Sequence, residues 1–314
     1  MIQSKIEPLY NWLLSERIKH KAERVVLWVA IVSYLIHLGL IVLNHFGIIQ
    51  SSANFLTNPI AAIYTPFSFI LVYEVYLLIF FLPKSISFYI GKQYEIITLI
   101  VIRRIFKDIS NLELEANDWW TNDSDLQFTY DVVTTVALFI LIFLFYRNIR
   151  KRKQIKKSKE VEGQDELEQP EKPKKRKRST EKFILLKKGL AVALVPVLAG
   201  LAIFTLGSWI KETYEGYYQG IKAFKDINNV FFEEFFTALI VVDVLLLLFS
   251  FFYSGQFHKI IRNSGFVIST ILLKISFSVD GVVSNALILG SVVFGLLMLI
   301  IHNVYEKKSI YLKL

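Results

Sequence analysis

The sequence contains no cysteine among its 314 residues. This absence excludes disulfide bonds, thiolate metal ligands and a cysteine nucleophile. The usual signatures of catalysis are missing too: the sequence has no H-E-x-x-H pair, no G-x-x-x-x-G-K-[ST] loop and no G-x-S-x-G turn. The potassium-filter motif T-V-G-Y-G is also absent. We therefore expect a protein that is not an enzyme and that holds neither a metal nor a cofactor.

Charged residues are scarce as well, at 20% of the chain, compared with about 25% in soluble domains. Hydrophobic residues make up 54% and occur in continuous blocks, so a single protein core cannot bury them all. A helix crosses a bilayer with about 20 apolar residues, and it satisfies its own backbone hydrogen bonds in lipid. The sequence therefore predicts an all-α, polytopic integral membrane protein whose first partner is the lipid bilayer.

One basic segment carries the net charge of the chain. Between Arg147 and Lys188, 17 Lys and Arg residues outnumber 7 Asp and Glu, which gives +10 in a chain of +9. Its middle has almost no apolar residues to bury, so we expect it to be disordered. A basic block between apolar regions is typical of a cytosolic loop. The pattern predicts a disordered linker at 149–183 between transmembrane halves at 25–148 and 184–303.

The number of crossings follows from the placement of the charges. With four crossings in each half, the N-terminal segment 1–24, the linker and the tail 304–314 share one side, as the positive-inside rule favours. In the alternative, the short third segment of each half lies at the interface and one basic region faces outward. We therefore predict about eight spans, a plasma (bacterial inner) membrane location and cytosolic termini. The expected spans are 25–47, 62–83, 93–108, 128–148, 184–210, 234–254, 264–279 and 282–303.

The two halves resemble each other in the order of their charges. Each has an acid inside an apolar run, Glu74 in the first half and Asp243 in the second, followed after 29 and 31 residues by Arg103 and Lys274. A long apolar run then closes each half. Basic loops are expected between acid and cation, with Lys84 and Lys92 in one half and His258, Lys259 and Arg262 in the other. This recurrence predicts a duplication into two similar four-helix halves, which an even number of crossings would make parallel repeats.

Charged residues inside the expected spans are the candidate functional residues. A charge at the middle of a bilayer costs at least about 2.5–3.5 kcal/mol to insert, so Glu74 and Asp243 are expected to face the bundle interior. Their expected partners are the cations of the following segment, namely Arg103, Arg104 and Lys274. These residues either line or gate an ion or proton pathway, or they form static ion pairs that fix the helix packing.

His37 is a further candidate for the pathway because it lies midway along the first apolar run. A lone intramembrane histidine can relay protons near neutral pH. The equivalent run of the second half contains no ionisable residue, so the favoured interpretation is a buried, hydrogen-bonded histidine with a structural role.

Three functions are compatible with these features. The first is a channel or transporter for a small ion. The second is a non-transporting scaffold, sensor or effector whose linker binds an acidic protein or anionic lipid, since Lys and Arg near a membrane attract anionic headgroups at about 1 kcal/mol each. The linker residues expected to do so are Lys174, Lys175, Arg176, Lys177 and Arg178. An intramembrane enzyme acting on a lipid is the least favoured. A homo-oligomer is compatible with each function, and nucleic acid is not an expected partner.

Overall fold

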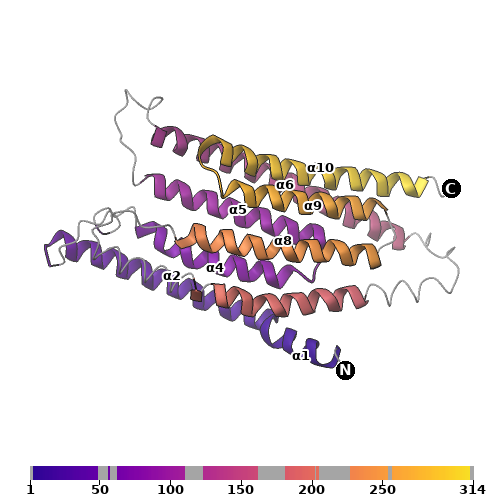
Figure 1. The fold of residues 1–314 in the computed structure, drawn as a ribbon, viewed down its shortest axis with the longest axis horizontal. Coiled ribbons are helices and arrows are strands. Elements are labelled where there is room, and N and C mark those ends of the chain that lie inside the picture. Colours follow the sequence, from indigo (N-terminus) through magenta and orange to yellow (C-terminus); the bar gives the residue numbers. More distant parts are fainter. Residues whose placement is uncertain are drawn as a thin grey trace.

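A computed structural model of the chain describes residues 3–48, 56, 62–109, 123–161, 181–201, 203–204, 227–253 and 257–311. The elements within these ranges are helices, without a strand, which confirms the all-α class. The helices lie side by side along the long axis of the molecule (Figure 1). In chain order they are α1 (Gln3–Leu13), α2 (Glu16–His45), α4 (Tyr64–Phe81), α5 (Ile86–Ile109), α6 (Asp123–Val161), the helix Glu181–Leu201, α8 (Ile227–Tyr253), α9 (Phe257–Ser276) and α10 (Gly281–Tyr311).

Five stretches of helix in the described part of the chain are long and apolar enough to cross a membrane. They are Ile6–His45, Asp125–Arg150, Glu181–Leu201, Glu234–Tyr253 and Gly281–Lys307. α4 is apolar but has only 18 residues, while charged residues interrupt α5 and α9. Length and composition therefore support a multi-pass membrane protein, whereas eight full crossings stay a prediction.

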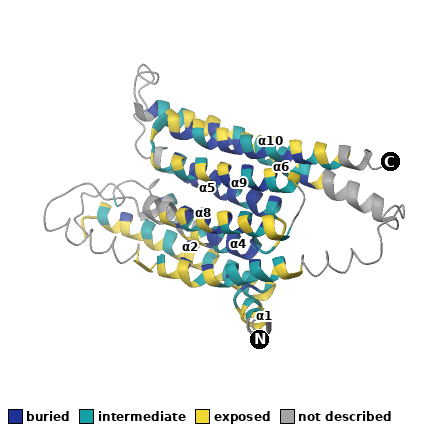
Figure 2. Ribbon diagram, turned by 45° about the vertical axis from the view of Figure 1, so that its right-hand side comes forward, coloured by how far each residue is buried: buried dark blue, intermediate teal, exposed yellow. Residues whose placement is uncertain are grey.

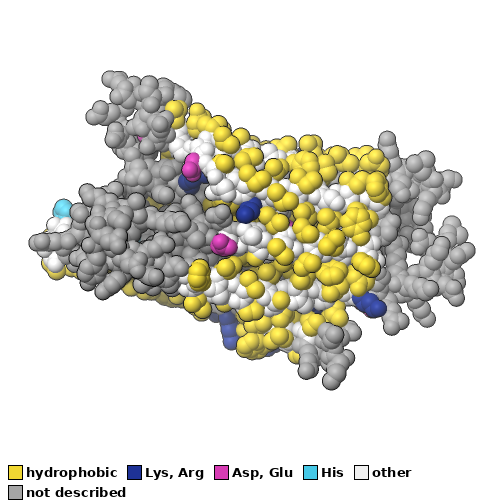
Figure 3. Space-filling model, viewed as in Figure 1, with side chains coloured by type: hydrophobic (Ala, Val, Ile, Leu, Met, Phe, Trp, Pro, Cys, Tyr) yellow, Lys and Arg dark blue, Asp and Glu magenta, His cyan; other side chains and the backbone are white. Residues whose placement is uncertain are grey.

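An apolar belt surrounds the described helices. α2 buries only Ala30 and Ile41, whereas Trp28 is 68% exposed and Leu35 is 60% exposed. Exposed apolar side chains also cover α6, α8 and α10, and Figure 3 shows them across the middle of one face. Soluble monomers rarely expose a contiguous apolar patch of more than a few hundred Å². This belt therefore fits contact with lipid acyl chains better than contact with water.

α5 and α9 are longer than the sequence predicts. The spans expected at 93–108 and 264–279 begin at Ile86 and Phe257 instead. Residues assigned to basic loops are consequently helical: Lys92 lies in α5, and His258, Lys259 and Arg262 lie in α9. Only a short turn over residues 82–85 joins α4 to α5. The expectation was wrong because a cation does not end a helix when a neighbouring helix supplies its hydrogen-bond partners.

Helix also occupies parts of the expected N-terminal segment and linker. α1 and the first turns of α2 lie within 1–24, and α6 continues to Val161. α6 thus continues past 149, where the disordered linker was expected to begin, since Lys, Arg and Gln have high helix propensity and prolong α6 beyond its apolar part. Residues 162–180, which include the basic cluster 174–178, lie outside the described residues.

Both chain ends lie at one end of the bundle (Figure 1), which we call the terminal end. At this end Lys188 Nζ donates to Glu7 Oε1 of α1 over 3.2 Å. Next to it, Lys187 Nζ donates to the carbonyl of Lys84 over 2.8 Å. The turn between α4 and α5 and the start of the helix Glu181–Leu201 therefore also lie at the terminal end. The other end of the bundle is called the opposite end below.

The helices pack in the same order in each half. α5 packs against α4 and α6, while α9 packs against α8 and α10. The halves meet where α6 lies along α10 and α5 contacts α9. Large side chains fill these contacts, such as Tyr94 and Phe145 with ring centroids 5.2 Å apart. Figure 2 shows that the buried residues lie where these helices face one another.

The common terminal end predicts a labelling pattern, and the lack of cysteine removes any background. We expect the exposed positions His20→Cys, Lys182→Cys and Tyr305→Cys to react with a membrane-impermeant maleimide from one side of the membrane. Asp280→Cys, at the opposite end, is the control and should react from the other side. Labelling of oriented vesicles before and after permeabilisation measures the pattern, and reaction of His20→Cys and Tyr305→Cys from different sides would contradict it.

The close approach of α10 to α5 depends on Gly295. A Cβ atom at Gly295 would overlap the hydroxyl of Tyr94, whereas one at Gly290 meets nothing within 4 Å. Replacing glycine by alanine inside a helix ordinarily stabilises by about 1 kcal/mol. We expect Gly290→Ala to keep or raise the thermal unfolding midpoint in detergent, and Gly295→Ala to lower it by displacing Tyr94 from Ser269. Equal midpoints for the two variants would show that α10 does not pack this closely.

Candidate functional site

Polar side chains are buried between the helices, both within the second half and where the two halves meet. They form three groups along the bundle, centred on Asp243, on Arg262 nearer the terminal end, and on Asp131 toward the opposite end. Each of these central residues is less than one tenth exposed. Burial of an ionisable group is costly unless hydrogen bonds or opposite charges compensate it, so the partners of each residue indicate its role.

Asp243 lies near the middle of α8 and is 5% exposed. Its Oδ2 accepts a hydrogen bond from Gln93 Nε2 of α5 over 3.1 Å. Gln93 Oε1 in turn accepts from Thr270 Oγ1 of α9 over 2.9 Å. This chain of hydrogen bonds links three helices. The expected partner Lys274 is not bonded to Asp243, because it lies one turn beyond Thr270, toward the opposite end of α9.

The nearest compensating charge for Asp243 comes from Lys187, a buried residue on the helix Glu181–Leu201. Lys187 interacts electrostatically with Asp243, but its ammonium donates to the carbonyl of Lys84. Tyr89, one turn before Gln93 on α5, interacts electrostatically with Asp243 as well. Asp243 is thus held by neutral groups, with a cation nearby but not in a direct ion pair.

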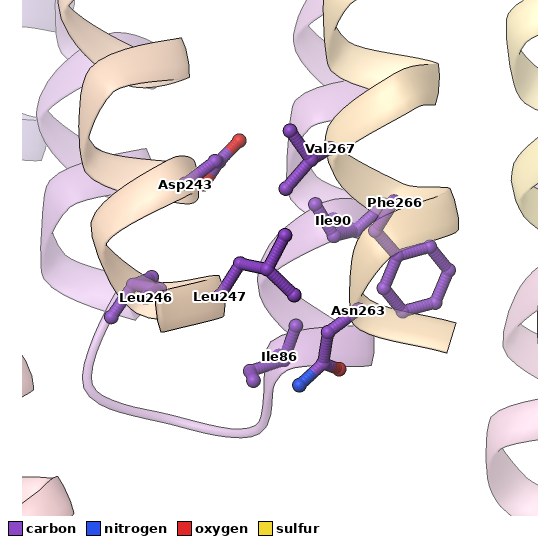
Figure 4. Close-up of a pocket in the computed structure, with 8 residues that line it drawn as sticks. All are labelled: Ile86, Ile90, Asp243, Leu246, Leu247, Asn263, Phe266 and Val267. Atoms are coloured by element: carbon purple, nitrogen blue, oxygen red, sulfur yellow. The ribbon is translucent and has the colours of Figure 1, made fainter. Parts of the chain in front are cut away.

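A small cavity lies beside Asp243 (Figure 4). Its volume is about 10 Å³, roughly the space in which the centre of one water molecule fits. The polar residues of its wall are Asp243 and Asn263, which lie on either side of Leu247 in the view. The apolar residues of the wall are Ile86, Ile90, Leu246, Leu247, Phe266 and Val267.

Asn263 connects the cavity to the group around Arg262. Its Nδ2 donates to Ser250 Oγ over 2.8 Å, and its Oδ1 accepts from Arg262 Nη2 over 2.9 Å. Arg262 Nη1 lies 3.1 Å from His302 Nε2 of α10. Because a guanidinium only donates, Nε2 accepts, and the proton sits on Nδ1, which donates to the carbonyl of His258 over 3.2 Å. The hydrogen-bond pattern therefore assigns a neutral His302.

His258 and His302 stack with ring centroids 5.1 Å apart. They are 44 positions apart in the sequence and come from α9 and α10, so no local spacing pattern could pair them. Their position completes a path of polar groups from the terminal end to the cavity beside Asp243.

The third group is an ion pair between Arg104 of α5 and Asp131 of α6. Arg104 donates from Nε and from Nη2 to the two carboxylate oxygens, the latter over 2.7 Å. Asp131 is fully buried, and its Oδ1 also accepts from Asn285 Nδ2 of α10 and from Gln127 Nε2, each over 2.8 Å. A bidentate Arg–carboxylate contact is strong and geometrically specific. This group therefore fixes α5, α6 and α10 to one another.

The sequence suggested that Arg104 pairs with Glu74, but in the structure the two residues do not pair. The antiparallel packing of α4 and α5 puts Arg104 near the opposite end, while Glu74 lies near the middle of α4. Glu74 is half-buried and interacts electrostatically with Lys92 and Glu95 of α5. Lys92 Nζ itself donates to Glu95 Oε2 over 2.5 Å. Glu74 thus has a cation, Lys92, on the next helix. The sequence alone suggests a loop position for this lysine.

The other two candidates lie away from Asp243. Arg103 is 3% exposed and, like Arg104, lies near the opposite end of the bundle on α5. His37 Nδ1 lies 2.6 Å from Thr65 Oγ1, which links α2 to α4. This contact fits the structural role favoured for His37. The five linker cations at 174–178 lie outside the described residues.

Sequence reasoning missed most of the partners because it looked only at charges. Gln93, Asn263 and Thr270 are neutral, yet each lies on the buried face of its helix. On α9 the signal was present: Asn263, Phe266, Thr270 and Leu273 recur at helical spacing and share one buried face. Asp131 was overlooked because it lies at the start of the expected span 128–148, whereas Glu74 and Asp243 stand inside apolar runs.

No protein-family model, no curated protein and no solved structure matches this chain. Within the described ranges, no cluster of three or more His, Asp or Glu residues is arranged to hold a metal ion. The three polar groups and the apolar surface around them are the features of the described residues that point to a function.

The Arg104–Asp131 ion pair predicts a pattern of stability. Asp131→Ala leaves Arg104 without its carboxylate and is expected to cost about 3 kcal/mol. The double variant Arg104→Met with Asp131→Leu removes both charges and should unfold at a higher temperature than Asp131→Ala. Thermal unfolding in detergent measures this, with the exposed Asp280→Ala as the control. If Asp131→Ala unfolds at the same temperature as the control, the pair does not hold the helices together.

Proposed function

We propose that this protein is a membrane channel or transporter for a small cation, and that Asp243 binds the ion in transit. The proposal rests chiefly on one observation: a buried carboxylate, bonded to the neutral Gln93, borders a cavity with room for one water. The five long apolar helices and the apolar belt support placement of Asp243 within a bilayer. Ionisable residues at that depth usually mark ion or proton pathways.

Comparison with Asp131 supports this role for Asp243. Asp131 is bound by Arg104 through two charge-assisted hydrogen bonds, as suits a structural carboxylate. Among the described residues, Asp243 has no cation in hydrogen-bond contact, and it forms part of the wall of the cavity. A carboxylate in that setting can take up and release a proton or a small cation without breaking an ion pair.

The size of the cavity favours a proton over a larger ion. A proton moves along hydrogen bonds, whereas a hydrated metal cation needs a wider passage. Toward the terminal end, Asn263 and Arg262 lead to His302 and His258. Toward the opposite end, Tyr94 and Ser269 are 2.8 Å apart, and Ser269 Oγ donates to the carbonyl of Ser291 over 2.8 Å.

Apolar residues interrupt this route before it reaches the Arg104–Asp131 ion pair. Leu273 and Ile288 are both buried between the two polar regions. We infer that passage requires a change in the packing of α9 and α10, as in a gated channel or a transporter with alternating access. Ser284 Oγ, which donates to the carbonyl of Ser276 over 2.8 Å, already joins the two helices beyond the interruption.

We also propose that the halves arose by duplication and that the terminal end faces the cytosol at a plasma membrane. The repeated packing order of the helices supports the duplication. Glu74 and Asp243 are also similarly placed, seven residues before the end of α4 at Phe81 and ten before the end of α8 at Tyr253. The positive-inside rule supports the orientation, because the basic segments belong to the terminal end.

Proton flux into liposomes tests the role of Asp243. With purified protein and an imposed membrane potential, we expect Asp243→Asn to lower proton uptake at least tenfold, because the amide cannot exchange a proton. Asp243→Glu should retain part of the flux. Glu234→Gln makes the same change in charge at an exposed position of α8 and should behave as the wild type. Full proton flux in Asp243→Asn would remove Asp243 from the mechanism.

A further inference from the structure

Lysine side chains from separate parts of the chain converge on phenylalanine rings at the terminal end. Lys19 of α2 and Lys84 of the turn after α4 lie 5.2 and 5.0 Å from the ring centroid of Phe80. Lys84 is also 4.9 Å from the centroid of Phe81. We call these four residues the lysine–phenylalanine site. It shares no residue with the route through Asp243.

Two ammonium groups over one ring repel each other, so a negative charge beside them would stabilise the site. Glu16 supplies one such charge: its Oε2 is 2.7 Å from Lys19 Nζ and its Oε1 is 3.7 Å from Lys84 Nζ. Glu16 lies in the first turn of α2, which Ser15 caps, and the helix dipole adds positive potential there. One exposed carboxylate therefore balances two lysines and the positive end of a helix.

The lysines retain hydrogen-bonding capacity for an additional anion. Each ammonium carries three donors. Lys19 donates to Glu16, while the 3.7 Å between Lys84 Nζ and Glu16 Oε1 is too long for a hydrogen bond. The ring contacts also restrain both side chains, and the side chain of Lys19 is only 19% exposed. An anion that binds here would find cations already held in place, which reduces the entropy cost of binding.

Apolar surface begins next to these lysines. On α2, the exposed Leu27 follows Lys19 by eight residues, about two helical turns, and on α4 the exposed Val72 and Phe69 precede Phe80. On α1, Trp12 is 68% exposed, as is common for tryptophan at a membrane interface. The site thus joins a cationic, donor-rich head to an apolar surface along α2 and α4.

We propose that the lysine–phenylalanine site binds the headgroup phosphate of an anionic phospholipid, whose acyl chains lie along α2 and α4. A free phosphate ion would use the lysines but not the apolar surface. An acidic protein would not match a site at the edge of a lipid-facing belt. The lipid would bridge α2 to the turn between α4 and α5, and it would complete the neutralisation that Glu16 begins.

The test is a titration of the purified full chain in neutral detergent, followed by thermal unfolding. Phosphatidylglycerol should raise the unfolding midpoint in a saturable manner, whereas phosphatidylcholine and inorganic phosphate should not. Lys19→Gln with Lys84→Gln should raise the half-saturating lipid concentration at least about tenfold, since each lysine near a headgroup contributes about 1 kcal/mol. Glu16→Gln removes the competing carboxylate and should lower that concentration.

Lys21→Gln with Lys182→Gln is the matched control, because it removes the same charge from exposed positions at the same end. An equal loss of lipid response in this control would reduce the effect to general surface charge and overturn the proposal. An unchanged response in Lys19→Gln with Lys84→Gln would overturn it too. A midpoint shift with inorganic phosphate as large as with the lipid would assign the site to a soluble anion instead. The opposite response expected of Glu16→Gln keeps the test decisive if the lysine variants fold poorly.

Discussion

The bidentate contact between Arg104 and Asp131 is the interaction on which the arrangement of the bundle depends. Between helices in lipid, burial of apolar surface gives little net attraction, so close packing and polar contacts must hold them together. This ion pair, with Asn285 and Gln127, fixes α5, α6 and α10 in one register. That register sets α5 against α9 and so brings Gln93 to Asp243.

The two buried aspartates show how environment divides one side-chain type between two roles. Asp131 has used its acceptor sites on Arg104, Asn285 and Gln127, and any change of its protonation would break several bonds at once. Asp243 borders a cavity and holds one amide contact to Gln93. The aspartate toward the opposite end therefore serves to hold helices together. The aspartate near the middle of the bundle has fewer contacts to break when it binds a proton or an ion.

The sequence alone predicted the features that depend on composition. Apolar blocks placed a helix at each expected span, and the lack of alternation excluded one soluble core. The sequence did not predict contacts that depend on how distant helices are aligned. Arg104 pairs with Asp131, 27 positions away, and Asp243 bonds to Gln93, 150 positions away. The sequence also failed where cations such as Arg262 were taken to mark loops, since only the folded bundle supplies His302 and Asn263 as partners.

The hydrogen bond from Lys187 to the Lys84 carbonyl has a consequence for assembly. It attaches the first helix of the second half directly to the turn between α4 and α5, and Lys188 attaches the same helix to Glu7. Side chains therefore help to set how the halves meet at this end. Two halves produced as separate chains would keep these described contacts, together with those of α6 along α10 and of α5 with α9.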